Sequence, residues 1–322
     1  MKIGHPVLFS VLLLAGCGRQ EATSEAGHGG LLKKTTVSLA EARQGFKTKL
    51  IRKESADEPV PEPPQDLFRI VRYDSTVGKL AALLSPDPKD GKKHPAIIWI
   101  TSGDCNTIDD GIWKTLPADF DQTSRAASAF RKAGLALMFP TLRGGNDNPG
   151  FKEGFFGEVD DVLAAADFLS KQPFVDPQRI YLGGLSTGGT LVLLVGASSD
   201  RFRAVFSFGP TDDVSRYGRD LLPFDRTDRR EVELRSPKNW LQSIRSVTFV
   251  FEGTEKSNLH ALLAMKRAST NPKVHFYPVK GAGHVTVLGR VAEIIAGKIA
   301  RDVGPEVKIT FTEDELNRAF EK

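Results

Sequence analysis

Apolar runs about the length of a β-strand alternate with helix-like segments over most of the chain after residue 66. Residues 95–100 and 135–140 are apolar at nearly every position, which is typical of strands covered on both faces. Residues 158–169 instead repeat apolar positions every three or four residues, as a helix with one buried face does. Strands that alternate with helices indicate right-handed crossovers and a mostly parallel sheet with helices on both faces. The pattern therefore predicts the α/β fold class.

The predicted elements follow one another in a regular order. Residues 67–73 and 79–84 are predicted to form a hairpin, which a turn rich in Pro, Asp and Gly follows. Further strands are predicted at residues 95–100, 135–140, 179–182, 202–208, 246–251 and 273–279, and helices at 120–133, 158–169, from about 187, at 258–268 and at 291–299.

The chain begins with the pattern of a secretory signal. One cation, Lys2, precedes an apolar stretch at residues 7–15 that is too short to span a bilayer as a mature helix. The stretch ends in Leu-Ala-Gly-Cys, which resembles the lipobox of bacterial lipoproteins. This resemblance implies a lipid anchor on Cys17, and ordinary cleavage nearby with a free thiol is the alternative. By resemblance to enteric lipoproteins, Gly18 favours the outer membrane, with the protein facing the periplasm.

A polar segment follows the signal. Residues 57–64 are acidic and Pro-rich, which favours a stiff linker without a core. Residues 38–49 are predicted to hold a short helix. We therefore expect a signal peptide at residues 1–16, a lipid-anchored tether and linker at 17–65, and one domain at 66–322.

The composition excludes several classes of protein. The chain has 322 residues, of which 40% are hydrophobic, and 44 Lys and Arg against 40 Asp and Glu give a net charge of +4. These values exclude a disordered, collagen-like or coiled-coil chain. Basic runs interleaved with aromatic residues are absent from the sequence, so a nucleic-acid partner is not expected. The sequence also lacks His-Glu-x-x-His and paired-cysteine motifs, so we expect neither a metal nor another cofactor.

Residues 184–188 read Gly-Leu-Ser-Thr-Gly at the junction of a predicted strand and a predicted helix. This pattern is typical of a nucleophile on a sharp turn, where the Ser186 hydroxyl projects above the sheet. The backbone N–H of Thr187 and the helix N-terminus then face a developing oxyanion. Two alternatives are a Walker A loop in which Gly189 replaces the phosphate-binding lysine, and a purely structural glycine turn.

A nucleophilic serine needs a base and a group that orients the base. Among the six histidines, His284 follows the last predicted strand in the loop Lys-Gly-Ala-Gly-His, where glycines let its side chain project over the sheet edge. The acid is expected between Ser186 and His284 in the chain. The loop at residues 252–258, Glu-Gly-Thr-Glu-Lys-Ser-Asn, follows the preceding strand and offers candidates.

Residues 67–301 resemble the α/β-hydrolases of the prolyl oligopeptidase and dienelactone hydrolase type. The resemblance implies the α/β-hydrolase fold and a serine hydrolase, with Arg143 as a loop anchor. The matching stretches are Phe-Arg-Lys-Ala-Gly-Leu-Ala at residues 130–136, Leu-Arg-Gly at 142–144, Glu-Val-Asp-Asp-Val at 158–162, Asp-Pro-Gln-Arg-Ile at 176–180, and the turn at Ser186.

The chain departs from that family at the acid. The family has an Asp three residues after the glycine of the 252–258 loop, and Lys256 stands at that position here. We expect Glu255, one residue earlier, to replace it. Asp212 or Asp213, after the preceding strand, is one alternative, and the lack of a working acid is the other.

A second departure concerns the oxyanion hole. The family has a His-Gly-Gly-like turn after the strand at residues 95–100, and this chain has Thr-Ser-Gly-Asp-Cys. Backbone N–H groups around Gly103 are still expected to serve with that of Thr187. The carboxylate of Asp104 would oppose a developing oxyanion. Cys105 is expected to be a small buried residue.

These features predict a lipid-anchored serine hydrolase without a cofactor that cleaves a small ester or a short peptide through an acyl-enzyme. In this prediction Ser186 attacks, His284 transfers the proton and Glu255 orients His284. Residues 213–237 lie where a cap over the substrate site would insert, and a solvated loop and helix is the alternative. The alternative, which Lys256 and Asp104 favour, is a catalytically silent hydrolase-fold lipoprotein that binds a ligand or partner.

Overall fold

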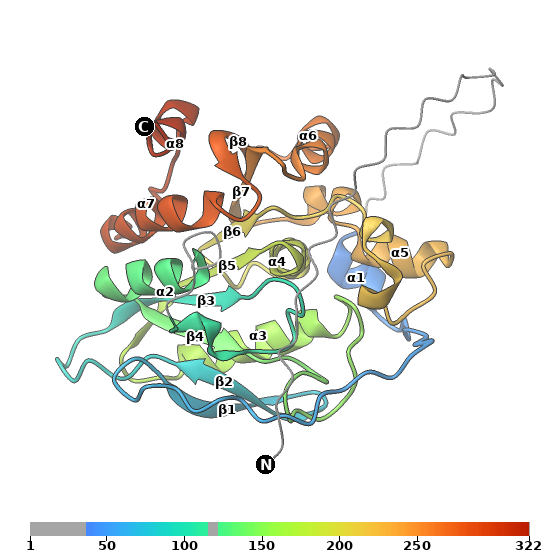
Figure 1. The fold of residues 1–322 in the computed structure, drawn as a ribbon, viewed down its shortest axis with the longest axis horizontal. Coiled ribbons are helices and arrows are strands. Elements are labelled where there is room, and N and C mark those ends of the chain that lie inside the picture. Colours follow the sequence, from blue (N-terminus) through green and yellow to red (C-terminus); the bar gives the residue numbers. More distant parts are fainter. Residues whose placement is uncertain (1–36, 115–121, 322) are drawn as a thin grey trace, which may run out of the picture. The chain divides into compact units, whose positions relative to one another are not determined.

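The computed structural model describes residues 37–114 and 122–321, and its centre is an eight-stranded sheet in the order β1-β2-β4-β3-β5-β6-β7-β8 (Figure 1). The pairs β1–β2 and β2–β4 are antiparallel, and every other neighbouring pair is parallel. This arrangement confirms the predicted α/β class. The strands are β1 Arg69–Ser75, β2 Gly78–Leu84, β3 His94–Ile100, β4 Ala136–Pro140, β5 Val175–Leu185, β6 Ala204–Phe208, β7 Val247–Glu255 and β8 Val274–Gly283.

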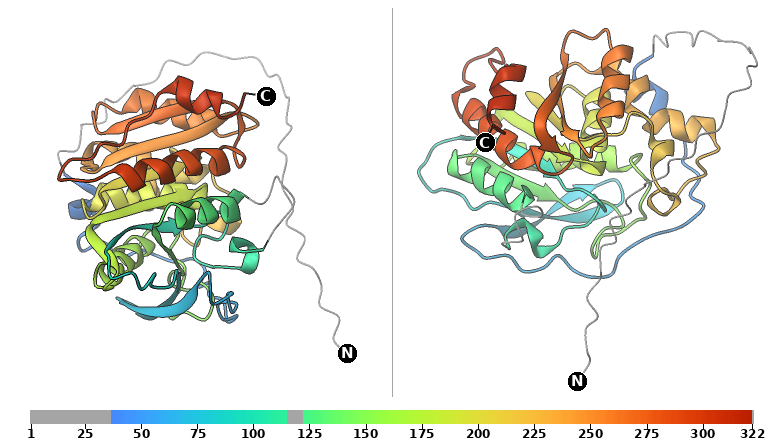
Figure 2. Two further views of the ribbon diagram at one scale, coloured as in Figure 1. Left: turned by 90° about the vertical axis from the view of Figure 1, so that its left-hand side faces the viewer. Right: turned by 45° about the horizontal axis from the view of Figure 1, so that its top comes forward.

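Helices cover both faces of the sheet. On one face, α2 (Gln122–Lys132) packs against α7 (Val287–Arg301) (Figure 2). On the other face lie α3 (Glu158–Ser170), α4 (Thr187–Ser198) and α6 (Leu259–Ala268), which contribute to a separate apolar cluster. The described part of the chain also has three shorter α-helices, α1 Leu39–Arg43, α5 Arg229–Arg235 and α8 Glu313–Arg318, and five single-turn 3₁₀-helices.

The continuous apolar runs are explained by these two clusters. Successive side chains of a strand point to opposite faces of the sheet. On β3, Ile98 and Ile100 join the cluster with α3 and α4, and Ile97 and Trp99 join the cluster with α2 and α7. A strand between two helical layers therefore needs an apolar residue at every position.

All the predicted strands are present, and only their ends differ. The predicted hairpin is confirmed by the antiparallel pairing of β1 with β2. β5 begins at Val175, four residues before the predicted start, and β8 continues to Gly283, past the predicted end at residue 279. Neither α5 nor α8 was predicted, because each is too short for a clear period; their starts are marked by the capping residues Asp228 and Thr312.

Residues 37–65 pack on the domain and do not form a free tether. They belong to the same compact unit as the rest of the described chain. Leu39 of α1 is buried in the cluster with α4, and Val60 of the Pro-rich run is buried in the other cluster. A polar average composition predicts a linker, but a few apolar anchors among polar neighbours are enough to attach it. Residues 1–36, with the predicted signal peptide and Cys17, lie outside the described residues.

Residues 213–237, which we name the cap region, are anchored by a buried ion pair. Arg235 and Glu231 of α5 are in contact, and their side chains are 0% and 1% exposed. Glu231 also accepts a hydrogen bond from the backbone N–H of Lys49. Arg235 donates to the hydroxyl of Thr48 and to the carbonyl of Glu153. This ion pair therefore joins the cap region to two other segments of the chain.

We expect Arg235→Met to lower the free energy of unfolding by about 3–5 kcal/mol, because it leaves the Glu231 carboxylate buried without its partner. The matched control is Arg245→Met, since Arg245 forms an ion pair with Asp200 in which the side chains are 72% and 69% exposed. That control should change stability by less than about 0.5 kcal/mol. Urea unfolding followed by tryptophan fluorescence measures both values. Equal stabilities would show that the buried pair does not anchor the cap region.

Candidate active site

Ser186 lies on the sharp turn between β5 and α4, with φ 58° and ψ −112°. A positive φ is uncommon for a residue with a side chain and marks a constrained position. The backbone N–H of Ser186 donates to the carbonyl of Phe208 at 2.7 Å. A Cβ on Gly184 would lie 2.6 Å from the backbone of Gly188, so the turn requires glycine there. This is the geometry expected of a nucleophile at the carboxyl end of a strand.

His284, in the loop after β8, is hydrogen-bonded to Glu252. Its Nδ1 lies 3.1 Å from Glu252 Oε2. The Glu252 side chain is 1% exposed and that of His284 is 23% exposed. Within the described residues the Nε2 atom of His284 has no hydrogen-bond partner. A buried acid thus orients the imidazole through one nitrogen and leaves the other available to a substrate or to a serine.

The structure contradicts the prediction that Glu255 orients His284. Strand β7 continues through Glu255, whose side chain is exposed and whose backbone pairs with Gly283 after a shift in register. The last buried acidic residue of the strand is Glu252, three residues earlier. The signal in the sequence was an acidic residue that closes an otherwise apolar strand, since such a residue needs a partner once it is buried.

The alternative acids also contact other groups. Asp213 accepts hydrogen bonds from the Lys238 ammonium at 2.8 Å and from the Ser215 hydroxyl at 2.7 Å. Asp212 forms ion pairs with Arg216 and Lys238. Neither carboxylate contacts His284 in the described structure.

Gly209 links the serine turn to the histidine–glutamate pair. It follows Phe208, the residue that binds the backbone of Ser186, and it has φ +56°. A Cβ on Gly209 would lie 2.4 Å from Cε1 of His284 and 3.0 Å from Oε2 of Glu252. The carboxyl end of β6 therefore contacts both parts of the candidate site, and only glycine leaves room for the imidazole.

The two predicted oxyanion contributors lie together. Thr187 is the first residue of α4, so its N–H has no acceptor within the helix. Its hydroxyl donates to the carbonyl of Gly103 at 3.0 Å and fastens the loop after β3 to the serine turn. Asp104 accepts hydrogen bonds from Lys152 at 2.7 Å and from the Thr107 hydroxyl at 2.6 Å. Its negative charge is therefore compensated by Lys152.

Two further residues near the site have structural roles. Cys105 is buried, and burial raises the pKa of its thiol well above the usual value, so it stays protonated at neutral pH and is a poor nucleophile. Arg143 is also buried and binds Asp161 through Nε and Nη2, each at 2.9 Å, and Glu153 at 2.7 Å. Arg143 thus anchors its loop, as the sequence predicted.

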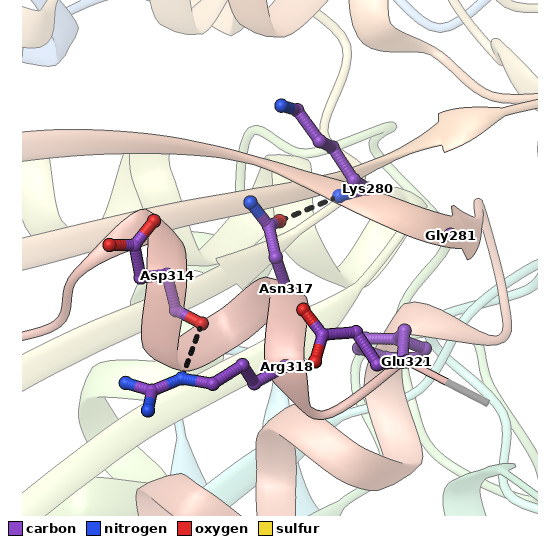
Figure 3. Close-up of a pocket in the computed structure, with 7 residues that line it drawn as sticks. Lys280, Gly281, Asp314, Asn317, Arg318 and Glu321 are labelled. Atoms are coloured by element: carbon purple, nitrogen blue, oxygen red, sulfur yellow. Dashed lines mark hydrogen bonds between the residues drawn. The ribbon is translucent and has the colours of Figure 1, made fainter.

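Two cavities differ in their relation to this site. A cleft of about 160 Å³ adjoins Thr187 and Gly103. A larger cavity of about 700 Å³ lies between α8 and the end of β8 (Figure 3), where the side-chain oxygen of Asn317 accepts a hydrogen bond from the N–H of Lys280 at 2.9 Å. Neither lining includes Ser186 or His284, but that of the smaller cleft includes Thr187 and Gly103, so the smaller cleft is the one next to the candidate oxyanion site.

Neither a metal site nor a membrane-spanning helix is found in the described part of the chain. Residues 37–114 and 122–321 contain no group of three or more His, Cys, Asp or Glu side chains placed to hold a metal ion. In the same part of the chain, every helix is too short or too polar to cross a membrane.

Comparison with known proteins agrees with the predicted resemblance. Residues 123–265 match the prolyl oligopeptidase family. Dipeptidyl peptidase 4 from Bos taurus is 27% identical over 202 residues, which are 60% of this chain and 24% of that protein. The chain thus spans about a quarter of the length of this relative.

Solved structures share the fold. An acylaminoacyl peptidase from Pyrococcus horikoshii superposes with a TM-score of 0.54 and 16% identity, over 79% of this chain and 44% of that one. An esterase from Pyrobaculum calidifontis gives a TM-score of 0.51 and 17% identity, over 76% of this chain and 87% of that one. Residues 123–265 are therefore similar to the prolyl oligopeptidase family, and the described chain has the α/β-hydrolase fold that these solved structures share.

Proposed function

We propose that the chain is a serine hydrolase that cleaves an ester or a peptide bond through an acyl-enzyme. The observation that carries this proposal is the hydrogen bond of 3.1 Å between His284 and the buried Glu252. Both side chains lie against Gly209, beside the strained turn of Ser186. Nucleophile, orienting acid and base follow one another in the chain as Ser186, Glu252 and His284, the order typical of α/β-hydrolases.

The proposed mechanism uses each of these groups once. Ser186 Oγ attacks the substrate carbonyl while His284 Nε2 takes its proton. Glu252 holds the imidazole through Nδ1 and stabilises the imidazolium that forms. The N–H of Thr187 and a backbone N–H near Gly103 donate to the oxyanion. The leaving group departs with the proton of His284, and a water activated by the same histidine then releases the acid product.

The two features that favour a silent binding protein in the sequence are each offset in the structure. Lys256 stands where the family has its acid, but Glu252 supplies a carboxylate to His284 from another position on β7. The charge of Asp104 is compensated by Lys152. These two features therefore do not argue against catalysis. If the protein were nevertheless a silent binding protein, it would fold but would not react with a serine-directed probe.

The test is covalent labelling with a fluorophosphonate, which reacts with activated serines. Labelling mapped to Ser186 by peptide analysis supports the proposal, and a folded protein without label contradicts it. The kcat/KM of the same preparation is then measured on an ester and on an amide that carry the same acyl group. Both are tested because the similar proteins include a peptidase and the similar structures include an esterase by name. The ratio of the two kcat/KM values assigns the reaction.

Gly209→Ala should lower the rate of this labelling at least about 100-fold, because the new Cβ would push the imidazole of His284 out of place. The matched control is Gly218→Ala, since a Cβ on Gly218 would meet no atom within 4 Å. That control should label at the wild-type rate. A wild-type rate for Gly209→Ala would mean that His284 is not the base.

We also propose that the lipid anchor on Cys17 places the enzyme in the bacterial cell envelope. The support for it is the sequence pattern alone, since residues 1–36 lie outside the described residues.

A further inference from the structure

The cleft of about 160 Å³ beside Thr187 is formed by five separate segments of the chain. It adjoins Thr187 and Gly103, which contribute to the proposed oxyanion site, so the cleft lies next to the place where the carbonyl of a substrate would bind. The lining residues are Glu54, Gly103, Asp104, Cys105, Asn106, Lys152, Gly154, Phe155, Thr187, Asp220 and Leu221.

One wall depends on residues 48–56, which we name the strap. Backbone hydrogen bonds join the strap to two neighbours: Ile51 N–H donates to Pro223 at 2.7 Å, and Glu54 accepts from Lys152 N–H at 2.9 Å. Its Arg52 side chain donates through Nη2 to three carbonyls of the cap region, those of Arg219, Asp220 and Leu222, at 2.9, 3.2 and 3.2 Å. The strap therefore holds the Asp220–Leu221 wall in place.

A second part of the lining is fixed by Phe155. This aromatic residue has φ 75°, a conformation that a bulky side chain adopts only when its surroundings impose it. Its ring stacks on Tyr217 at 5.6 Å, and the Tyr217 hydroxyl is hydrogen-bonded to Thr190 at 2.7 Å. A Cβ on Gly154 would lie 2.8 Å from Pro223, so this loop also packs tightly on the cap region. The Phe155 side of the cleft is therefore held in place by packing.

The size and charge of the cleft define its guest. A cavity of about 150 Å³ holds a benzene molecule, so this cleft fits one group of that size. The Glu54 carboxylate is paired with Arg52 at 2.6 Å, and that of Asp104 with Lys152 at 2.7 Å. Asp220 is exposed and has no ion-pair partner in the described part of the chain. Phe155, Cys105 and Leu221 supply apolar surface.

We propose that the strap is a specificity element, which limits the acyl group, or the residue before the cleaved bond, to one uncharged group of about the size of benzene. The inference rests on the proposed function of Ser186. It assigns to an N-terminal segment, distant in sequence from the catalytic residues, the role of fixing one side of the substrate cleft.

The experiment compares kcat/KM for 4-nitrophenyl butyrate and 4-nitrophenyl decanoate. The wild type should prefer butyrate by at least about tenfold, a difference of about 1.4 kcal/mol or more. Arg52→Ala frees the cap wall, so the preference should fall at least about fivefold while butyrate hydrolysis stays within about threefold. The control is Arg125→Ala, an exposed arginine paired with Glu293 on another face, which should keep the wild-type ratio.

A second variant covers the case in which Arg52→Ala does not fold. Phe155→Gly suits φ 75° and enlarges the cleft directly, so it should reduce the preference for butyrate in the same way. An unchanged ratio in the folded variants, or a wild type that prefers decanoate, overturns the inference. A further comparison uses the 4-nitrophenyl esters of lysine and of norleucine, whose side chain is uncharged. A higher kcat/KM for the lysine ester would also overturn the inference, because it would mean that Asp220 selects a cation.

Labelling separates this inference from the proposed function. A small fluorophosphonate could label Ser186 in all these proteins while the ratio of kcat/KM for butyrate to that for decanoate is the same in each. In that case only the role of the strap is contradicted. If none of the folded proteins is labelled, the proposed function and the inference fail together.

Discussion

Ser186→Ala should abolish fluorophosphonate labelling and lower kcat by at least about 10⁴-fold, because the substitution removes the atom that bonds to the substrate. Stability should be nearly unchanged. The hydrogen bonds of Ser186 within the fold use its backbone, with the N–H donating to Phe208 at 2.7 Å and the carbonyl accepting from Thr190 N–H at 2.9 Å. The Oγ atom therefore contributes to chemistry and not to packing. Mass spectrometry of the labelled peptide and a thermal melt measure the two effects.

The control for this substitution lies at the other end of α4, the helix that Ser186 precedes. The Ser198 hydroxyl, near the end of α4, is buried and has no hydrogen-bond partner among the described residues. Ser198→Ala should label and turn over like the wild type. Label that persists in Ser186→Ala, or a loss of activity of equal size in Ser198→Ala, would remove Ser186 from the mechanism.

The parts of the fold that the sequence predicted are those with one strong physical signal. Strands such as β3 are apolar at every position because both of their faces are covered, and this pattern is visible without the structure. The sharp turn at Ser186 was also predictable, because a serine between glycines at a strand-to-helix junction is typical of this geometry. The loop position of His284 was predictable from the end of the last strand.

The acid was missed because its position depends on where a strand ends. The family pattern points to Lys256 and then to its neighbour Glu255, on the assumption that a loop begins at residue 252. In the structure β7 continues to Glu255, and His284, in the loop after β8, is hydrogen-bonded to the buried Glu252. Strand ends are set by pairing with a neighbour, here β8, and a single sequence does not contain that information.

The attachment of residues 37–65 was hidden for a related reason. Several of the hydrogen bonds that attach this segment use backbone groups, such as Ala56 N–H to the carbonyl of Gly144 at 3.0 Å. Backbone contacts leave no compositional trace, so a polar, Pro-rich stretch is taken for a linker. The substrate cleft was unpredictable from the sequence for the same reason, since its strap wall depends on these contacts.

Glu252→Gln should lower kcat by about 10³–10⁴-fold while the protein stays folded, because glutamine keeps the shape but cannot stabilise the imidazolium of His284. An amide facing Nδ1 also favours the wrong tautomer of the imidazole, which then presents no lone pair to Ser186. The matched control is Glu255→Gln, the same change three residues away on an exposed side chain, and its activity should stay within about twofold of the wild type. The measurement is kcat/KM on the best ester, with labelling rates as a second readout.

A positioning role for Glu252 has a signature that simple destabilisation lacks. If Glu252 acts only through His284 and Ser186, the double variant Ser186→Ala, Glu252→Gln should be no slower than Ser186→Ala alone, since residues that act as one unit are strongly non-additive. Glu252→Asp keeps the charge but shortens the side chain, and it should recover part of the activity that glutamine loses. Losses that multiply in the double variant would place Glu252 outside the catalytic unit, and a larger loss in Glu255→Gln would restore the acid that the sequence predicted.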